Sequence, residues 1–231
     1  MPFNKNISGY KNENEFVYEL NHKYFKELNP MFSSFIKTLF PSIKESYMIK
    51  VSGNYEKQKA DIFIEVNNVK KGISIKKGIK NSVHVEPLKM FINFLRQLGI
   101  KEDILERIKY YHYADDTIDG TGLERKSSEE YKVNHQEDII KINKALNQNK
   151  ILLAAVNRFV LVGNNSDVSI DAILYGVTND FIWISKKEII EVVLKYKNLE
   201  ATGIHFGPLF YQPMNRCLNR NPLYEDLRHK I

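Results

Sequence analysis

The sequence predicts an α/β fold, in which short β-strands follow amphipathic helices. Two stretches near the N-terminus, 14–28 and 30–40, carry apolar residues at the spacing of a helix face. Runs rich in β-branched and aromatic residues come next, and they are expected to form strands at 47–52, 60–66 and 72–77. A chain that alternates such elements buries the apolar faces of its strands against helices.

The rest of the chain continues this alternation. A helix is expected from Pro87 to Leu98, with Gly99 as its stop. Further helices are expected at 102–108, from Ser127 or Ser128 to 147, and from a capping box at 185–188 onward to 196. Segments 168–175 and 181–184 are expected to form a second hairpin. Periodicity leaves open whether the apolar segment 151–162 is a helix or a strand.

One hairpin carries the most specific chemical signal. Its first strand begins near Asp61, and its second strand ends at Lys76. A register symmetric about Asn68 and Val69 would place Asp61 directly across from Lys76. Because side chains alternate along a strand, Ser74 and Lys76 are expected to share the solvent-facing side. A carboxylate and an ammonium that face each other there form either an ordinary surface ion pair or part of an active site.

The hairpin resembles the PD-(D/E)xK nuclease superfamily, which includes most type II restriction enzymes. In this resemblance Ala60-Asp61 stands for the Pro-Asp element, and Ser74-Ile75-Lys76 stands for the (Asp/Glu)-x-Lys element. The resemblance implies a restriction-endonuclease-like core, which is a mixed β-sheet flanked by helices. It also implies hydrolysis of phosphodiester bonds in double-stranded DNA with Mg²⁺, for which Mn²⁺ is expected to substitute.

Ser74 stands where the superfamily usually carries its second acid. Some restriction enzymes of the superfamily have Ser at this position and supply the acid from the helix that follows, and the resemblance assigns that role to Glu86. Glu86 is expected at the entrance of that helix, where the helix dipole favours a carboxylate. Ordinary N-terminal capping of the helix by Glu86 is the alternative.

The expected chemistry gives each of these residues a role. Asp61 and Glu86 would bind the metal ion, because a hard divalent cation relieves the repulsion between two close carboxylates. The resemblance adds the backbone carbonyl of Ile75 as a third ligand. Lys76 would orient or help to deprotonate the attacking water and would stabilise charge on the phosphate. Ser74 would hydrogen-bond a metal-bound water or Glu86.

Three nearby features have two interpretations each. Glu45, expected in a helical run at 42–46, is either a further acid of the site, as superfamily members often place a glutamate in the preceding helix, or a solvated residue. His84 either contacts phosphate or tunes the site, or it faces solvent in a loop. The acid-rich segment 114–122 is interpreted as a turn or as a loop lying against DNA, in preference to a catalytic loop.

Composition narrows the class of protein. The 231 residues include 34 basic and 28 acidic side chains, and the net charge of +6 suits a polyanionic partner. A single cysteine, Cys217, excludes an intrachain disulfide, and the absence of Cys/His clusters argues against structural zinc. The sequence has neither an apolar run of membrane-spanning length nor a P-loop motif, so a cytoplasmic protein without a nucleotide cofactor is expected.

The C-terminal segment is the candidate DNA-recognition element. Arginine recognises guanine, and asparagine or glutamine recognises adenine, through paired hydrogen bonds in the major groove. Segment 202–231 holds Arg216, Asn219 and Arg220, although a solvated basic loop that contacts only phosphates is the alternative. Further candidate DNA-contacting residues are Lys77, Lys80, Arg125 and Lys126.

Together these features predict a single domain, 1–231, that acts as a type II restriction enzyme. A homodimer is expected, because two-fold protein symmetry matches a short palindromic site. Two alternatives stay open. One is a nuclease of the same fold that serves repair or a mobile element and cuts by structure. The other is a DNA-binding module on an inactive scaffold, which the serine at position 74 makes reasonable.

Overall fold

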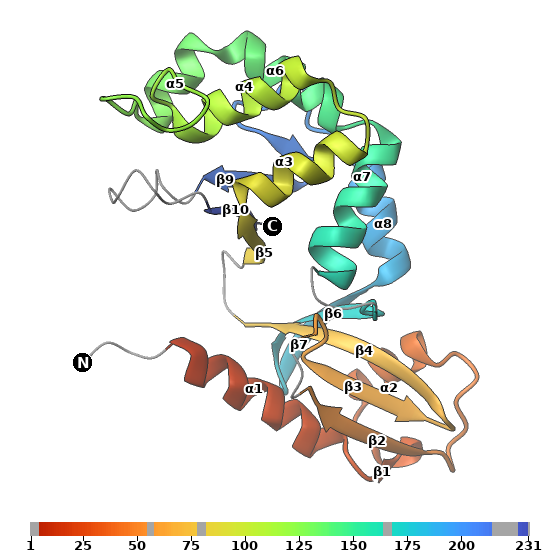
Figure 1. Cartoon of the computed structure of the whole chain (residues 1–231). Coiled ribbons are helices and arrows are strands. Elements are labelled where there is room, and N and C mark those ends of the chain that lie inside the picture. The colour runs from red at the N-terminus through yellow and green to blue at the C-terminus, as the bar shows by residue number, and fades with distance from the viewer. Residues whose placement is uncertain (1–4, 55–57, 78–81, 164–167, 214–225, 231) are drawn as a thin grey trace. The chain divides into compact units, whose positions relative to one another are not determined.

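The computed structural model describes residues 5–54, 58–77, 82–163, 168–213 and 226–230 (Figure 1). The chain divides into two compact units. The first consists of Met1–Asn81 with Val160–Ile190, and the second of Ser82–Phe159 with Glu191–Ile231. The expectation that 1–231 behaves as a single domain stays a prediction.

The first unit is built on a mixed sheet. Its strands are β1 (Lys23–Tyr24), β2 (Met48–Gly53), β3 (Ile62–Val66), β4 (Val69–Lys76), β6 (Ala172–Val177) and β7 (Asp180–Ser185). They lie in the order β1-β2-β3-β4-β6-β7. Strands β4 and β6 are parallel, and the other neighbours are antiparallel. The predicted mixed sheet is therefore confirmed, as is the second hairpin, which is formed by β6 and β7.

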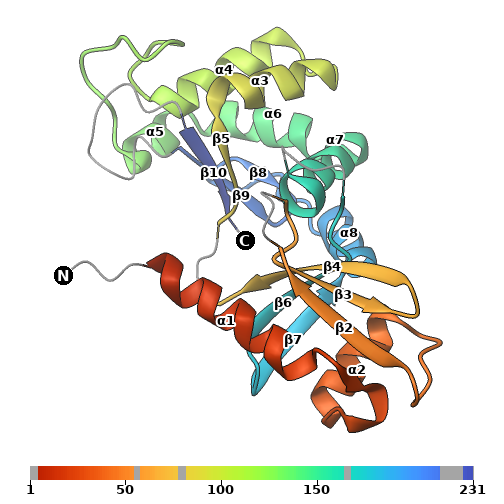
Figure 2. The same cartoon turned by 60° about the horizontal axis from the view of Figure 1, so that its bottom comes forward.

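Helices α1 (Lys5–Leu20) and α2 (Pro30–Leu39) pack against this sheet, and a short 3₁₀ helix, η1 (Phe25–Glu27), lies between them (Figures 1 and 2). Phe16 of α1 and Phe35 of α2 both contact Phe181 of β7 edge to face. Burying an aromatic side chain of this kind stabilises the fold by about 2–3 kcal/mol. The first helix was predicted at 14–28, but α1 begins at Lys5, and it ends at Leu20 before residues 23–24 pair with β2.

The hairpin turn is shorter than the sequence analysis expected. Asn67 and Asn68 both have positive φ, of 48° and 64°, and they form a two-residue turn of the kind that matches strand twist. Val66 therefore pairs with Val69, and Ile62 pairs with Ile73. Continued by one residue, this register places Asp61 across from Ser74. The predicted pairing of Asp61 with Lys76 was wrong by two residues. Because Asn67 and Asn68 adopt positive φ, the turn is centred on 67–68, one residue closer to the N-terminus than the sequence analysis assumed.

The second unit combines a smaller sheet with helices. Strands β5 (Ser82–Pro87), β10 (Asp226–Lys230), β9 (Leu209–Pro213) and β8 (His205–Phe206) lie in that order. The helices are α3 (Leu88–Gln97), α4 (Glu102–Tyr113), α5 (Ser128–Asn134), α6 (Gln136–Leu146) and α7 (Asn149–Ala155). Helix α3 contacts β5, and α6 contacts β8. Segment 202–231, expected as a recognition tail, thus contributes three strands to a sheet.

Several predicted boundaries change in the structure. The helix expected from 127 or 128 to 147 is divided at His135 into α5 and α6. Segment 151–162 is helical, because α7 continues into a π-helix, η2 (Val156–Val162). The capping box of Ser185 and Glu188 is confirmed by reciprocal hydrogen bonds, and it opens α8 (Lys186–Lys195). Helix α4 extends to Tyr113, five residues beyond the predicted end at 108.

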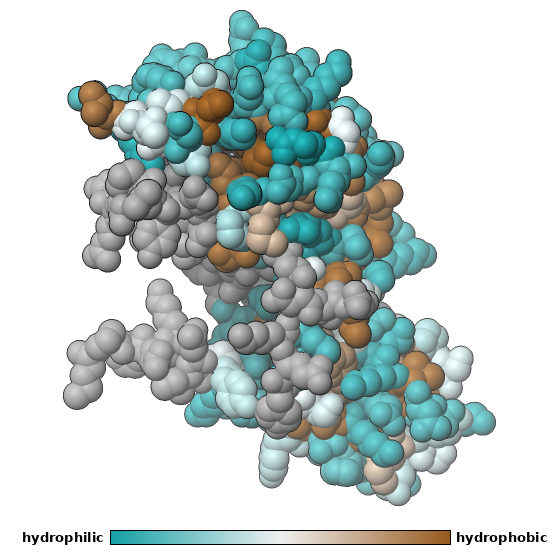
Figure 3. All heavy atoms as spheres, viewed as in Figure 1, coloured by the Kyte–Doolittle hydropathy of each residue, from teal (hydrophilic) through white to brown (hydrophobic). Residues whose placement is uncertain are grey.

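Hydrophilic side chains predominate on the face seen in Figure 3, and apolar residues appear there as separate patches. Among the described residues, no helix has both the length and the apolar character needed to cross a membrane.

Candidate active site

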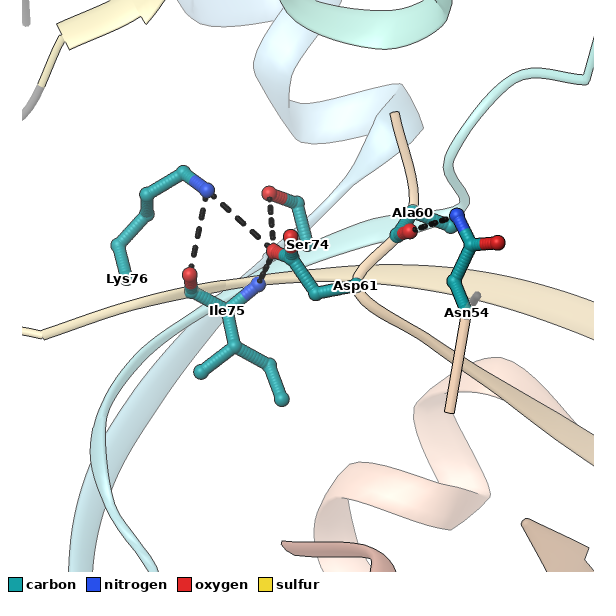
Figure 4. Close-up of polar contacts among 6 residues, drawn as sticks. All are labelled: Asn54, Ala60, Asp61, Ser74, Ile75 and Lys76. Atoms are coloured by element: carbon teal, nitrogen blue, oxygen red, sulfur yellow. Dashed lines mark hydrogen bonds and ion pairs between the residues drawn. The ribbon is translucent and has the colours of Figure 1, made fainter. Parts of the chain in front are cut away.

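The structure brings Asp61, Ser74, Ile75 and Lys76 together at one end of the β3–β4 hairpin (Figure 4). Three donors converge on Asp61 Oδ2. Ser74 Oγ donates at 3.0 Å, the Ile75 backbone N–H at 2.5 Å, and Lys76 Nζ at 3.3 Å. Lys76 Nζ also donates to the Ile75 carbonyl oxygen at 3.1 Å. Among the described residues, Asp61 Oδ1 accepts no hydrogen bond, so one carboxylate oxygen stays open for a ligand.

The backbone fixes Asp61 just before β3 begins. Its N–H donates to the Ile73 carbonyl at 2.8 Å, and its own carbonyl accepts from the Asn54 N–H at 3.0 Å. The Asn54 side chain donates to the neighbouring Ala60 carbonyl at 2.6 Å (Figure 4). Asp61 is therefore held from both neighbouring strand ends, and only its side chain can adjust to a substrate or ion.

Ser74 does not face solvent as the sequence analysis expected. The residue is only 1 % exposed, because its hydroxyl lies beneath the Asp61 carboxylate and donates to it. Lys76 keeps 24 % of its side chain exposed and Asp61 keeps 25 %. The ion pair thus lies at the surface, while the serine that supports it is buried. The observed hydrogen-bond partner of Ser74 is Asp61, and a bond to Glu86 or to a metal-bound water stays a prediction.

Glu13 of α1 is an acid near this site that the sequence analysis missed. Burial raises the pKa of Glu13, the nearby Asp61 carboxylate raises it further, and Lys76 offsets only part of this effect. Two carboxylates of the first unit are therefore close enough to repel each other. The sequence held one signal: Glu13 lies one helical turn before Phe16, at the edge of the buried face of α1.

A second lysine also lies near the site. Burial lowers the pKa of Lys59 to about 8, the neighbouring Lys76 ammonium contributes to that shift, and Asp61 opposes it. Two lysines and two carboxylates thus interact at this end of the hairpin. Lys59 directly precedes Ala60-Asp61 in the chain, so the motif itself could have indicated it.

Glu86 occupies a different setting, in the second unit. It lies in β5, one residue before Pro87, which forms the N-cap of α3. Its side chain is 0 % exposed, and Oε2 accepts a hydrogen bond of 2.6 Å from Arg158 Nη2. His84 Nε2 lies 3.6 Å from the other oxygen, Oε1. Burial alone raises the pKa of Glu86, but His84 and Arg158 outweigh burial and lower it.

This setting refines one expectation and corrects another. Glu86 lies at the helix entrance as expected, one residue before the N-cap of α3, but it also belongs to β5, which pairs with β10 from the far end of the chain. His84 is buried at 8 % exposure, so the interpretation of a solvent-facing loop histidine was wrong. Asp61 and Glu86 belong to different units, and the role of Glu86 as second metal ligand stays a prediction.

Glu45 lies outside the site. It is an exposed residue of a turn before β2, whereas a helix was expected there. Ile49 at the start of β2 pairs with Val66, and Gly53 at its end pairs with Ile62. Glu45 is therefore at the end of β2 that lies away from Asp61, and the expectation that it could join the site was wrong.

The acid-rich segment 114–122 forms a locally bonded turn. Asp115 accepts hydrogen bonds from the N–H and the hydroxyl of Thr117 and from the N–H of Gly122. Lys126 Nζ binds Asp116 at 2.6 Å, and a contact of Lys126 with DNA stays a prediction. These contacts agree with the interpretation of the segment as a turn.

The other candidate DNA-contacting residues are placed only in part. Lys77 is exposed after β4, and Arg125 is half-buried before α5. Their contact with DNA stays a prediction. Lys80, Arg216, Asn219 and Arg220 lie outside the described residues.

The donor set at Asp61 fits a hard divalent cation. No group of three or more His, Cys, Asp or Glu side chains suited to a metal occurs in the described part of the chain. Mg²⁺ does not need such a group, because it is usually bound by one or two carboxylates and keeps several waters. Asp61, Glu13 and the Ile75 carbonyl supply oxygen atoms only, and the repulsion between the two acids is what a cation would relieve.

The fold of this chain was compared with the folds of known proteins. Neither the protein-family models nor the curated proteins that were searched gave a match. Among solved structures, the chain is similar to restriction endonuclease MspI, which was solved in complex with its cognate DNA. The TM-score is 0.60 at 12 % sequence identity, and the match covers 100 % of this chain and 94 % of MspI. The chain therefore has a restriction-endonuclease-like fold.

Proposed function

We propose that the protein is a Mg²⁺-dependent endodeoxyribonuclease that hydrolyses phosphodiester bonds in double-stranded DNA. The observation that carries this proposal is the convergence of Ser74, Ile75 and Lys76 on the Asp61 carboxylate at the end of the β3–β4 hairpin. This arrangement lies in a fold that the chain shares with a restriction endonuclease. We further propose that the protein is a type II restriction enzyme and acts as a homodimer at a short specific site.

The chain's own residues would prepare the site for hydrolysis. Asp61 and the Ile75 carbonyl would hold the cation, which would supply a more acidic bound water and positive charge at the phosphate. Lys76 lies within hydrogen-bond reach of both Asp61 and Ile75, so its ammonium is fixed beside that position. There it can orient the attacking water and stabilise charge as the bond from phosphorus to the 3′ oxygen breaks.

Glu13 is the second carboxylate that the first unit itself offers. Burial raises its pKa and the nearby Asp61 carboxylate raises it further, and a bound cation would favour the ionised form of both acids. Glu86, the acid expected from the sequence, instead has a cationic partner of its own in Arg158. We therefore propose Glu13 as the second metal ligand and retain Glu86 as the alternative that mutation can distinguish.

Digestion of unmethylated, genome-sized DNA tests the proposed activity directly. Incubation with Mg²⁺ is expected to give discrete fragments whose ends share one sequence, Mn²⁺ is expected to substitute, and EDTA is expected to abolish cleavage. Lys76→Ala, with folding verified by circular dichroism, is expected to reduce the cleavage rate by about 10³-fold. Lys71→Ala is a matched control on the same strand, because Lys71 pairs with Asp171 and not with Asp61.

The outcomes separate the proposal from its alternatives. Fragments without a common end sequence would favour a nuclease that cuts by structure. Binding of DNA without cleavage under several divalent metals would favour an inactive DNA-binding module. Unchanged cleavage by the folded Lys76→Ala variant would show that the chemistry lies elsewhere. Sedimentation of the protein with and without a duplex that contains the cleavage site would test the proposed homodimer.

A further inference from the structure

Arg158 of η2 is held in one orientation by two neighbours in the second unit, Glu86 and Phe94. Its Nη2 donates to Glu86 Oε2 at 2.6 Å, and its guanidinium carbon lies 4.8 Å from the centre of the Phe94 ring. Its Nε is buried and has no hydrogen-bond partner among the described residues. A guanidinium that is paired on one side and stacked on an aromatic face loses little conformational entropy when it binds a further group.

The two members of this ion pair differ sharply in exposure. Arg158 keeps 23 % of its side chain exposed, whereas Glu86 keeps 0 %. In the other pairs of Lys or Arg with an acid in the described parts of the chain, the acid keeps at least 25 % of its side chain exposed. Only the cation of the Glu86–Arg158 pair therefore reaches the surface.

We propose that Arg158 binds a phosphate of the DNA backbone, and that Glu86 is the positioning residue that aims its guanidinium. This proposal rests on the proposed function, because DNA is the polyanion that a nuclease must hold. Guanidinium groups match the geometry of phosphate oxygens and often bind them through two parallel hydrogen bonds. Arg158 lies in a π-helical segment, and such segments are frequent at functional sites.

The proposal gives Glu86 a role that differs from metal binding. If Glu86 only neutralised Arg158, its replacement by glutamine would make the protein more positive and would strengthen DNA binding. If Glu86 aims Arg158, the same replacement releases the guanidinium from one of its fixed partners and weakens binding. The sign of this one change therefore distinguishes positioning from simple charge balance.

The test measures binding of a fluorescently labelled mixed-sequence duplex to the full chain in EDTA, over a series of salt concentrations. The Glu86→Gln/Arg158→Gln double variant removes both charges and so leaves no unpaired buried carboxylate. It is expected to bind about tenfold more weakly, with a salt slope that is smaller by about 0.9. Glu86→Gln alone is expected to weaken binding, and Phe94→Leu is expected to weaken it without changing the salt slope.

The matched control is Arg107→Gln/Asp138→Asn, which removes an ion pair of the same unit whose two side chains are 32 % and 27 % exposed. It is expected to bind DNA as the wild type does, and thermal melting verifies that every variant is folded. Wild-type affinity and slope in the folded Glu86→Gln/Arg158→Gln variant would overturn the inference, as would tighter binding by Glu86→Gln. A change in oligomeric state without a change in DNA binding would also overturn it, because Arg158 would then bind a carboxylate of a second copy.

The proposed function and this inference can fail separately, since binding in EDTA requires no catalysis. A wild type that cleaves DNA while the double variant binds normally would remove only the role of Arg158. If the wild type never cleaves DNA and the double variant binds it more weakly, the proposed nuclease function fails, and Arg158 is still a phosphate-binding residue.

Discussion

Glu13 in the first unit and Glu86 in the second have pKa values that are shifted in opposite directions, although burial acts to raise both. The pKa of Glu13 is raised, because burial and the Asp61 carboxylate outweigh the nearby Lys76. Burial also acts to raise the pKa of Glu86, but His84 and Arg158 reverse the direction. Glu86 has a cation of its own in Arg158, although its Oε1 has no hydrogen-bond partner among the described residues. Glu13 lies near a second carboxylate, and Lys76 offsets only part of the resulting shift in its pKa, which is why we propose Glu13 as a metal ligand.

The largest expected effect concerns the ion pair of Glu86 and Arg158 in the second unit. Arg158→Ala would leave the fully covered Glu86 carboxylate without the guanidinium that donates to its Oε2 at 2.6 Å, and it is expected to lower the free energy of unfolding by about 3–5 kcal/mol. Urea denaturation followed by circular dichroism measures this loss. The Glu86→Gln/Arg158→Gln pair, with both charges removed, is expected to recover most of it. A stable Arg158→Ala variant would show that the Glu86 charge is compensated in another way.

Local patterns in the sequence predicted the part of the site that lies on the β3–β4 hairpin. Asp61 and Lys76 lie on adjacent strands of one hairpin, so spacing along the chain was enough to bring them together. Ser74 was assigned to the solvent side because strand alternation does not reveal that a side chain will lie beneath a carboxylate. The register was missed by two residues, because two consecutive asparagines with positive φ shorten the turn.

The surroundings of Glu13 and Glu86 depend on contacts between residues that are far apart in the sequence. Glu13 meets the hairpin only because α1 packs on the sheet, and the helix was predicted to begin after it. The strand that contains Glu86 was not predicted, because its partner β10 comes near the C-terminus. Arg158 showed no pattern that linked it to Glu86, since nothing in the spacing of residues 86 and 158 indicates a contact. Hydrophobic periodicity gives the elements of the fold, but it does not show which charged residues meet.

A second prediction compares the two acids in catalysis. Glu13→Gln is expected to reduce the single-turnover cleavage rate by about 10²-fold, because one charged ligand of the proposed cation is lost. Glu86→Gln is expected to retain a rate within about tenfold of the wild type once DNA is saturating, since its proposed effect is on binding. Quenched-flow cleavage at saturating protein measures both rates. The reverse order would restore Glu86 as the second ligand, as the sequence resemblance implied.

A third prediction uses the pH dependence of stability. The pKa of Glu86 lies below its ordinary value of 4.5 in the folded state, so its ion pair stabilises the protein at pH values above that ordinary value. This contribution is lost as the pH falls through the lowered pKa and Glu86 becomes protonated. At pH 7, Glu86→Gln is expected to be less stable than the wild type by about 2 kcal/mol. Urea titrations between pH 7 and pH 3 should show this difference shrinking, and a constant difference would contradict it.

The smallest expected effect concerns the metal-free site itself. Glu13 has a raised pKa, so its charged form costs stability at neutral pH, and the cost disappears as the pH falls through that raised pKa. Glu13→Gln is therefore expected to stabilise the metal-free protein by up to about 1 kcal/mol. Mg²⁺ at ten times its dissociation constant should stabilise the wild type by about 1.4 kcal/mol, or raise its melting temperature by about 3–6 °C.

Thermal melts with and without Mg²⁺ measure both parts of this effect in the wild type, Glu13→Gln and Glu86→Gln. The Mg²⁺-dependent increase is expected to disappear in Glu13→Gln and to persist in Glu86→Gln, because only the first variant removes the repulsion that the cation relieves. Equal Mg²⁺ responses in all three proteins would place the cation away from Glu13. Loss of the response in Glu86→Gln alone would mean that the acid with a partner gives up Arg158 in order to bind the metal.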